Sequence, residues 1–394
     1  MTIISIVNRL PPEIDGIGDY AFNLARHLRQ YADINTHFIV TQPDWAKAQD
    51  LEGFLIDQVN QRSSATLLKL LRGQTTVLLH YASHAHAKKG CPFWLLHALE
   101  TWKQQTEGAK LIIMFHELYA MRKGIVPWNT DFWLLPFQKQ VAVRLARLGD
   151  RCLTSSERYA EVICQARQIQ SDVIPTLPVP STMGEPHQVL PLRERQRRLV
   201  IFGQSGNKKA AYQAVSQIRE VCRILNIQEI WDIGTKVSSA FPTLDGIRIV
   251  EVGKLPAVEV SEILSNSLAG FLSYDPVLLA KSTIFSAYSS HGVIPINTSG
   301  DLSLANGLVP NQHYWVPQNS DMNEIEWQAI ADRARVWYQS HNLEAQTRVF
   351  AAQITGQIHN IQNNHFANSH PIIHEPFVES SDEFHHQVVP SREQ

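Results

Sequence analysis

The sequence predicts an α/β protein with two domains, each built on a largely parallel sheet. Two distant segments, residues 3–28 and 271–296, share one pattern: an apolar strand, a polar or glycine-containing loop, and then a helix. Short apolar strands alternate with helical patterns throughout, which is typical of parallel sheets with crossover helices. The length of 394 residues exceeds the roughly 250–300 at which one core stops growing. We therefore expect two α/β domains that face each other.

The first domain is expected to span residues 1–180. Its first helix follows Gly16, because Ala21, Leu24 and Leu28 recur at helical spacing. Strands rich in Val, Ile, Leu and Phe are expected at residues 3–8, 36–40, 76–79, 111–115, 152–155 and 172–174. Further helices are expected at residues 93–105, 132–147 and 157–166.

A linker is expected at residues 181–197, because prolines cluster between Pro175 and Pro191 with little periodicity. Four arginines follow at positions 193, 195, 197 and 198. They are interpreted as a solvated entry to the second domain, and attraction to an anionic membrane surface is the alternative.

The second domain is expected at residues 198–340. Its strands are expected at residues 199–202, 229–233, 247–250, 270–273 and 293–296, and its helices at 208–225, 258–267 and 282–290. Two more helical patterns cover residues 323–339 and 343–361. Residues 341–363 are expected to form a terminal helical segment, and the polar, His-rich residues 364–394 a flexible tail.

The composition is that of a globular protein without bulk nucleic-acid binding, with 44% hydrophobic and 18% charged residues and a net charge of -2. The apolar runs are too short to span a bilayer, and the amino terminus lacks the pattern of a secretory signal. A cytoplasmic location is expected, with peripheral membrane association as an addition. The four cysteines have no CxxC spacing and are expected to be free thiols.

Ligands of open α/β sheets bind beyond the carboxyl ends of the strands, so the residues there are the candidate site. In the second domain, Tyr274, Lys281 and Ser282 lie near a strand end and a helix start, where an anion such as phosphate is favoured. In the first domain the candidates are Gly16, Gly18, His80, Tyr81, His84, His116, Glu117, Tyr119, Ser155 and Ser156.

The same residues also suggest two other functions. The segment Gly16–Ala21 fits the GxGxxA pattern of nicotinamide or flavin enzymes, but Pro11, Pro12 and their neighbours separate it from the strand, unlike the dinucleotide fingerprint. The histidines at 80, 84, 86 and 116 with Glu117 lack the HExxH arrangement of a zinc site. We interpret them as polar residues that line the site, and no metal ligand is expected.

Five segments together resemble the group 1, family 4-like glycosyltransferases of the GT-B fold. They are Gly16–Leu28, Met114–Tyr119, Thr154–Ser156, Phe202–Ser205 and Ser289–Ile296, in this order along the chain. The resemblance extends to about residue 360.

The resemblance implies two Rossmann-like domains across a cleft, with the carboxyl-terminal helix crossing back to the first. A nucleoside diphosphate sugar would be held mainly by the second domain, and a glycan, lipid-linked or small-molecule acceptor mainly by the first. His116 would contact the donor sugar, and Gly16 and Gly18 would lie against the donor diphosphate or the acceptor. The implied donor-binding residues of the second domain are Gly203, Ser205, Lys208, Lys209, Tyr274 and Ser282, and the implied acceptor-side residues are His80, Tyr81, His84, Glu117 and Tyr119.

One feature of the family is missing, namely a pair of glutamates around the last donor-binding helix. Residues Leu279–Ala287 contain no carboxylate to bind ribose or sugar hydroxyls. Lys281 could neutralise the diphosphate leaving group as charge develops. The first hypothesis is a glycosyltransferase that needs no metal or cofactor, acts with retention, and serves polysaccharide or glycolipid synthesis. The alternative is a catalytically degenerate GT-B protein that binds a nucleotide sugar or glycan as an assembly partner.

Overall fold

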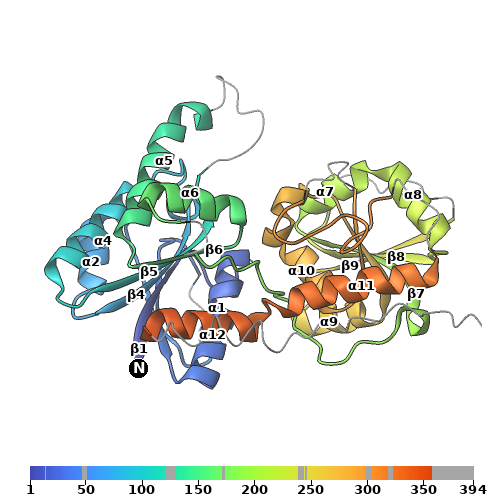
Figure 1. Cartoon of the computed structure of the whole chain (residues 1–394), viewed down its shortest axis with the longest axis horizontal. Coiled ribbons are helices and arrows are strands. Elements are labelled where there is room, and N and C mark those ends of the chain that lie inside the picture. The colour runs from blue at the N-terminus through green and yellow to red at the C-terminus, as the bar shows by residue number, and fades with distance from the viewer. Residues whose placement is uncertain are drawn as a thin grey trace, which may run out of the picture. The chain divides into compact units, whose positions relative to one another are not determined.

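The computed structural model describes residues 1–13, 15–46, 51–119, 130–170, 174–237, 244, 246–298, 304–317 and 323–356. Met1–Gly356 form one compact unit. Two parallel sheets with helices along them make up this unit (Figure 1), which confirms the predicted α/β class. The predicted tail, residues 364–394, lies outside the described residues.

The first sheet has six strands in the order β3-β2-β1-β4-β5-β6. The strands are β1 (Thr2–Val7), β2 (Asn35–Val40), β3 (Leu55–Gln58), β4 (Thr76–Ala82), β5 (Lys110–Glu117) and β6 (Arg151–Thr154). This is the order of the Rossmann fold, in which the direction of the strand sequence reverses between β1 and β4. The sequence missed β3, which is short and only partly buried. Of the strand expected at 172–174, Ile174 is not in a strand, and the other two residues lie outside the described ranges.

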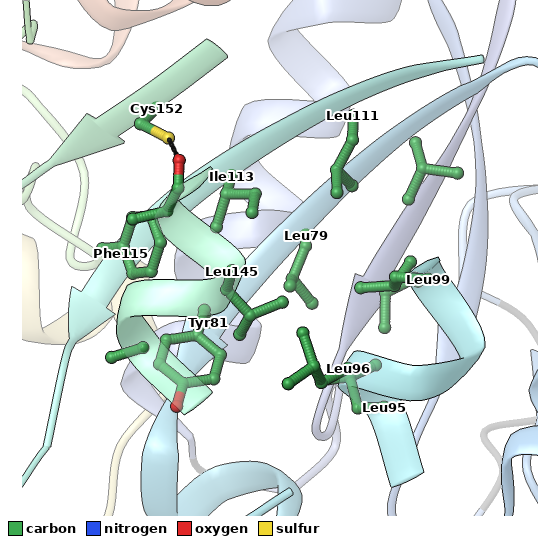
Figure 2. Packing of buried hydrophobic residues seen from close by; sticks show 14 of the residues in the cluster. Leu79, Tyr81, Leu95, Leu96, Leu99, Leu111, Ile113, Phe115, Leu145 and Cys152 are labelled. Carbon is green, nitrogen blue, oxygen red and sulfur yellow. Dashed lines mark hydrogen bonds between the residues drawn. The ribbon is translucent and has the colours of Figure 1, made fainter. Parts of the chain in front are cut away.

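Helices cover both faces of the first sheet. The helices of this half are α1 (Gly16–Ala32), α2 (Ser64–Leu70), α3 (Ser83–His86), α4 (Phe93–Gln105), α5 (Thr130–Leu148) and α6 (Glu157–Arg167). One core joins the sheet to α2, α4, α5 and α6, and Figure 2 shows part of it around Leu79, Leu96 and Leu145. The opposite face packs against α1 and α12 (Leu343–Thr355).

The second sheet has five strands in the order β11-β10-β7-β8-β9, so its order reverses between β7 and β10. The strands are β7 (Gln196–Gly203), β8 (Glu229–Gly234), β9 (Arg248–Gly253), β10 (Ser267–Leu272) and β11 (Ile294–Asn297). Its helices are α7 (Ser205–Gln213), α8 (Val215–Ile224), α9 (Ala257–Ser265), α10 (Thr283–Ser290) and α11 (Glu324–Gln339), with a 3-10 helix, η3 (Pro276–Lys281), before α10. The single helix expected at 208–225 is divided at Ala214, whose ψ of 44° is not helical.

The end of the predicted linker belongs to the second half of the molecule. Leu192 is buried in the core of the second sheet, and Gln196 begins β7. The neighbouring arginines are used locally. Arg195 is 6% exposed and donates to the carbonyl of Leu190, and Arg198, 7% exposed, stacks on the Trp231 ring. The four arginines therefore do not form one exposed basic patch.

The terminal helix α12 crosses back to the first sheet, as the resemblance implied. Phe350 and Ile354 of α12 join the core that contains Tyr20 and Leu24 of α1. The Lys110 ammonium donates to the Ile354 carbonyl at 2.7 Å. The helix is shorter than the expected 343–361, because it ends at Thr355 and Gly356 caps it in a left-handed conformation with a φ of 85°; residues 357–361 lie outside the described residues. Within the described chain, every helix is too short or too polar to cross a membrane.

Candidate functional site

Two histidines meet at the carboxyl ends of β4 and β5. Strand side chains alternate between faces, and His80 and His116 both fall on the face covered by α1 and α12. Their Nδ1 and Nε2 atoms, respectively, are 3.1 Å apart, and the two rings stack with centroids 5.3 Å apart. Burial, and secondarily His86, lowers the pKa of His80 to about 3. Burial also lowers the pKa of His116 well below its usual value, so both imidazoles are neutral near pH 7.

The other acceptor-side candidates do not all gather around this pair. Tyr81 points to the opposite face and is completely buried among the apolar side chains of Figure 2. This position does not agree with a ligand-contacting role for Tyr81. His84 and Glu117 lie beside each other, with His84 Nδ1 3.7 Å from Glu117 Oε1. Tyr119 lies just after β5, with the Lys139 ammonium 5.5 Å from its ring centroid.

The glycine loop closes on its own helix. Asp15 caps α1 by accepting from the amides of Ile17 and Gly18 at 2.9 and 3.1 Å. A Cβ at Gly18 would lie 2.4 Å from the Arg9 carbonyl oxygen, whereas a Cβ at Gly16 would meet nothing within 4 Å. Gly18 is thus required by close backbone packing. Two of the amides that the sequence offers to a diphosphate already bind Asp15.

Lys281, which precedes α10 in the second half of the molecule, contacts a helix of the first half. Its ammonium donates to the Tyr159 hydroxyl of α6 at 2.7 Å and lies 4.6 Å from the centroid of the Tyr159 ring. Burial lowers the pKa of Lys281, and the carboxylate of Glu117 acts in the opposite direction. Lys281 in turn contributes, after burial and His80, to the lowered pKa of His116. The charge of Lys281, which is expected to act on the diphosphate, thus contributes to the pKa of His116, which is expected to contact the sugar, although the two residues come from different sheets.

Tyr274 lies in the loop after β10, and Ser282 directly follows Lys281 at the start of α10. The loop after β10 is fixed by Asn297, whose side chain accepts from the Tyr274 amide at 2.9 Å and donates to its carbonyl at 3.0 Å. Burial, with smaller effects of Asp275 and Glu117, raises the pKa of Tyr274. The Ser282 hydroxyl caps α10 by accepting from the Phe285 amide at 3.2 Å.

The residues after β7 divide into an exposed and a buried group. Ser205 and Lys209 are exposed, and α7 begins at Ser205 without a side-chain cap, which leaves its first amides open to an anion. Lys208 is completely buried, and its ammonium binds the carboxylate of Asp232. The donor-binding role predicted for Lys208 therefore does not agree with its position. Gly203, at the end of β7, has a φ of 131° that disfavours other residues.

Sequence reasoning missed several residues of this region. Tyr159 lies one helical turn after Ser156, and no local pattern shows that its hydroxyl meets Lys281. Nearby, Glu157 and Asn306 join the two halves reciprocally: each backbone amide donates to the other side chain at 2.9 Å. In the sequence, Tyr20 is recognisable only as a member of the glycine motif Gly16–Ala21.

No protein-family model matches the sequence, and no curated protein matches it. Solved structures do match over most of the chain. An alpha-glucosyltransferase in complex with UDP has a TM-score of 0.54 at 10% identity, covering 89% of this chain and 99% of that one. The apo form of the lipopolysaccharide outer core galactosyltransferase WaaB has 0.52 at 14%, covering 91% and 100%. A putative UDP-N-acetylglucosamine 2-epimerase from Listeria monocytogenes has 0.56 at 12%, covering 90% and 96%. This chain therefore has the GT-B fold that these proteins share.

Proposed function

We propose that this protein is a glycosyltransferase that moves a sugar from a nucleoside diphosphate donor to a hydroxyl acceptor. The observation that carries the proposal is the position of Lys281, which extends from the second-sheet side to the Tyr159 hydroxyl of the first. A cation from one sheet and a neutral imidazole from the other, both near the carboxyl ends of strands, suit a substrate that combines a diphosphate with a sugar.

The roles divide between the two sheets. Lys281 would bind the diphosphate and stabilise the charge of the leaving group, helped by the open amides of α7 at Ser205. His116 would hydrogen-bond the donor sugar, because its imidazole is neutral and lies at the end of β5. Glu117 and His84 would face the acceptor. With lysine and backbone amides on the diphosphate, the reaction would need no metal.

We further propose that the protein is one of the group 1, family 4-like enzymes, that it retains the anomeric configuration of the sugar, and that it acts in polysaccharide or glycolipid synthesis. UDP is the first nucleotide to test, because two of the structurally similar proteins were solved with it.

The proposal is tested by incubating the protein with UDP-sugars and a panel of sugar and lipid-linked acceptors, and measuring UDP release. We expect His116→Ala to lower turnover much more than nucleotide affinity, because the imidazole would contact the sugar. His97→Ala is the matched control, because His97 is an exposed histidine of α4. Turnover that is unchanged in His116→Ala would remove this residue from the site.

A non-catalytic binding protein is the second candidate. It is favoured by the lack of any carboxylate in Leu279–Ala287 and by the pairing of Lys208 with Asp232. Tight binding of a nucleotide sugar without release of UDP, across the whole acceptor panel, would support this second function.

A further inference from the structure

Tyr20 connects the buried histidine pair to the carboxyl-terminal helix. Its ring packs edge-on against His116, with centroids 4.9 Å apart and an interplanar angle of 81°, and against His80 at 5.7 Å. Its hydroxyl donates to the Gln346 Oε1 atom of α12 at 2.5 Å. Phe350, also on α12, contacts the same ring at 6.4 Å between centroids. Tyr20 is 2% exposed, so all these contacts are internal.

The side-chain amide of Gln346 has only one suitable orientation. Its nitrogen donates to the carbonyl of Pro178 at 2.6 Å and to that of His341 at 2.8 Å. A flipped amide would place its oxygen against both carbonyls, so the oxygen must face Tyr20. Burial raises the pKa of Tyr20, which keeps the hydroxyl protonated and able to donate. The donor and the acceptor are therefore defined for each hydrogen bond that Gln346 makes with Tyr20, Pro178 and His341.

Gln346 also lies where the chain passes between the two sheets. Pro178 lies in the segment that connects the first sheet to the second, between β6 and β7. The amide of its neighbour Val179 donates to the carbonyl of Ala280, the residue before Lys281, at 2.8 Å. His341 lies in the segment that connects α11 to α12 and returns to the first sheet. The buried side-chain amide of Gln346 thus contacts both connecting segments and, through Tyr20, the histidine pair.

We propose that Gln346 and Tyr20 are positioning residues for His116. They would couple the orientation of the His116 ring to the positions of the two segments that connect the sheets, which contain Pro178 and His341. This inference rests on the proposed function only where turnover is measured. A change in the relative position of the sheets would move Pro178 or His341, and Gln346 would transmit that movement to the Tyr20 ring and to His116. The site would then be complete only in one arrangement of the sheets.

The test uses Tyr20→Phe, which keeps the ring and removes the donor, and Gln346→Leu, which removes the amide. Gln353→Leu is the matched control, because it changes a buried glutamine of the same helix that is not part of this chain of bonds. The first readout is the nitrogen spectrum of ¹⁵N-labelled histidines, with the His80 and His116 signals assigned from His→Gln variants. The second is kcat and KM for a nucleotide sugar.

We expect the His116 and His80 signals to shift in Tyr20→Phe and Gln346→Leu but not in Gln353→Leu. We expect kcat to fall about tenfold in both variants with KM nearly constant, because a small displacement of a reacting group lowers the rate more than binding. The double variant should match Gln346→Leu alone, since the two side chains act in series.

Wild-type histidine signals and kcat in Tyr20→Phe would overturn the inference, as would equal shifts in Gln353→Leu. Tyr20→Phe is conservative enough to keep the test valid if Gln346→Leu does not fold. If the wild-type protein releases no UDP from any donor, the proposed function fails, and the histidine spectra still decide this inference.

Discussion

Replacing Lys208 separates a structural role of this lysine from a ligand-binding one. Lys208 is completely buried and the Asp232 side chain is 4% exposed, so solvent screens their pairing little. The Tyr212 hydroxyl donates to the second carboxylate oxygen of Asp232 at 2.7 Å. Lys208→Met keeps the apolar stem but leaves the charge of Asp232 with one partner. Loss of one member of a buried ion pair costs about 3–5 kcal/mol, and we expect a decrease of this size in the free energy of unfolding.

The assay is urea unfolding followed by tryptophan fluorescence. The double variant Lys208→Met/Asp232→Asn also removes the unpaired charge of Asp232. It should recover more than half of the free energy of unfolding that Lys208→Met loses. Lys209→Met, a change at the exposed neighbouring lysine, should remain within about 0.5 kcal/mol of wild type. The reasoning is refuted if Lys208→Met is as stable as wild type and instead weakens binding of a nucleoside diphosphate. In that case the lysine would reach the ligand, as the sequence predicted.

Two further predictions concern the start of α1. Gly18→Ala should lower the free energy of unfolding by about 1–3 kcal/mol, because its Cβ would lie 2.4 Å from the Arg9 carbonyl oxygen. Gly16→Ala should leave the free energy of unfolding unchanged, because a Cβ there meets nothing within 4 Å. Equal losses for the two variants in urea unfolding would contradict this prediction. Burial, and then the charge of Asp15, raises the pKa of Asp19 from 3.8 to about 7. The folded state therefore binds more protons than the unfolded state between these values, and stability should fall as the pH rises from about 4 to 7. Asp19→Asn should flatten this part of a profile of melting temperature against pH, and an unchanged slope would show that Asp19 is not the group responsible.

The sequence was sufficient for the fold and for the parts of the site that depend on local patterns. The apolar runs at 76–79 and 111–115 place His80 and His116 at the carboxyl ends of two strands, and the strand–loop–helix pattern places Tyr274 and Lys281 near a strand end. Each of these positions depends on residues that are close in the chain.

The contacts between distant segments could not be predicted in this way. Tyr159 and Lys281 are 122 residues apart, and their meeting depends on how the two sheets are placed. Lys208 was predicted to bind a ligand because the family resemblance implies a basic residue there, and nothing local shows that Asp232, on the neighbouring strand β8, lies against it. Tyr81 was predicted to line the site because its strand was expected to end at residue 79, whereas β4 continues to Ala82 and alternation turns the Tyr81 side chain to the other face.

The most direct test of the central claim is a calorimetric titration of the protein and of Lys281→Met with UDP and with uridine. The claim is that Lys281 binds the diphosphate of a nucleotide, so the variant should lose about tenfold or more in affinity for UDP, as expected for a lost charge-assisted hydrogen bond. Uridine should bind both proteins equally, and Lys236→Met, at a lysine side chain that is 82% exposed, should bind UDP like wild type. An equal loss for UDP and uridine, or no loss for UDP, would contradict the claim.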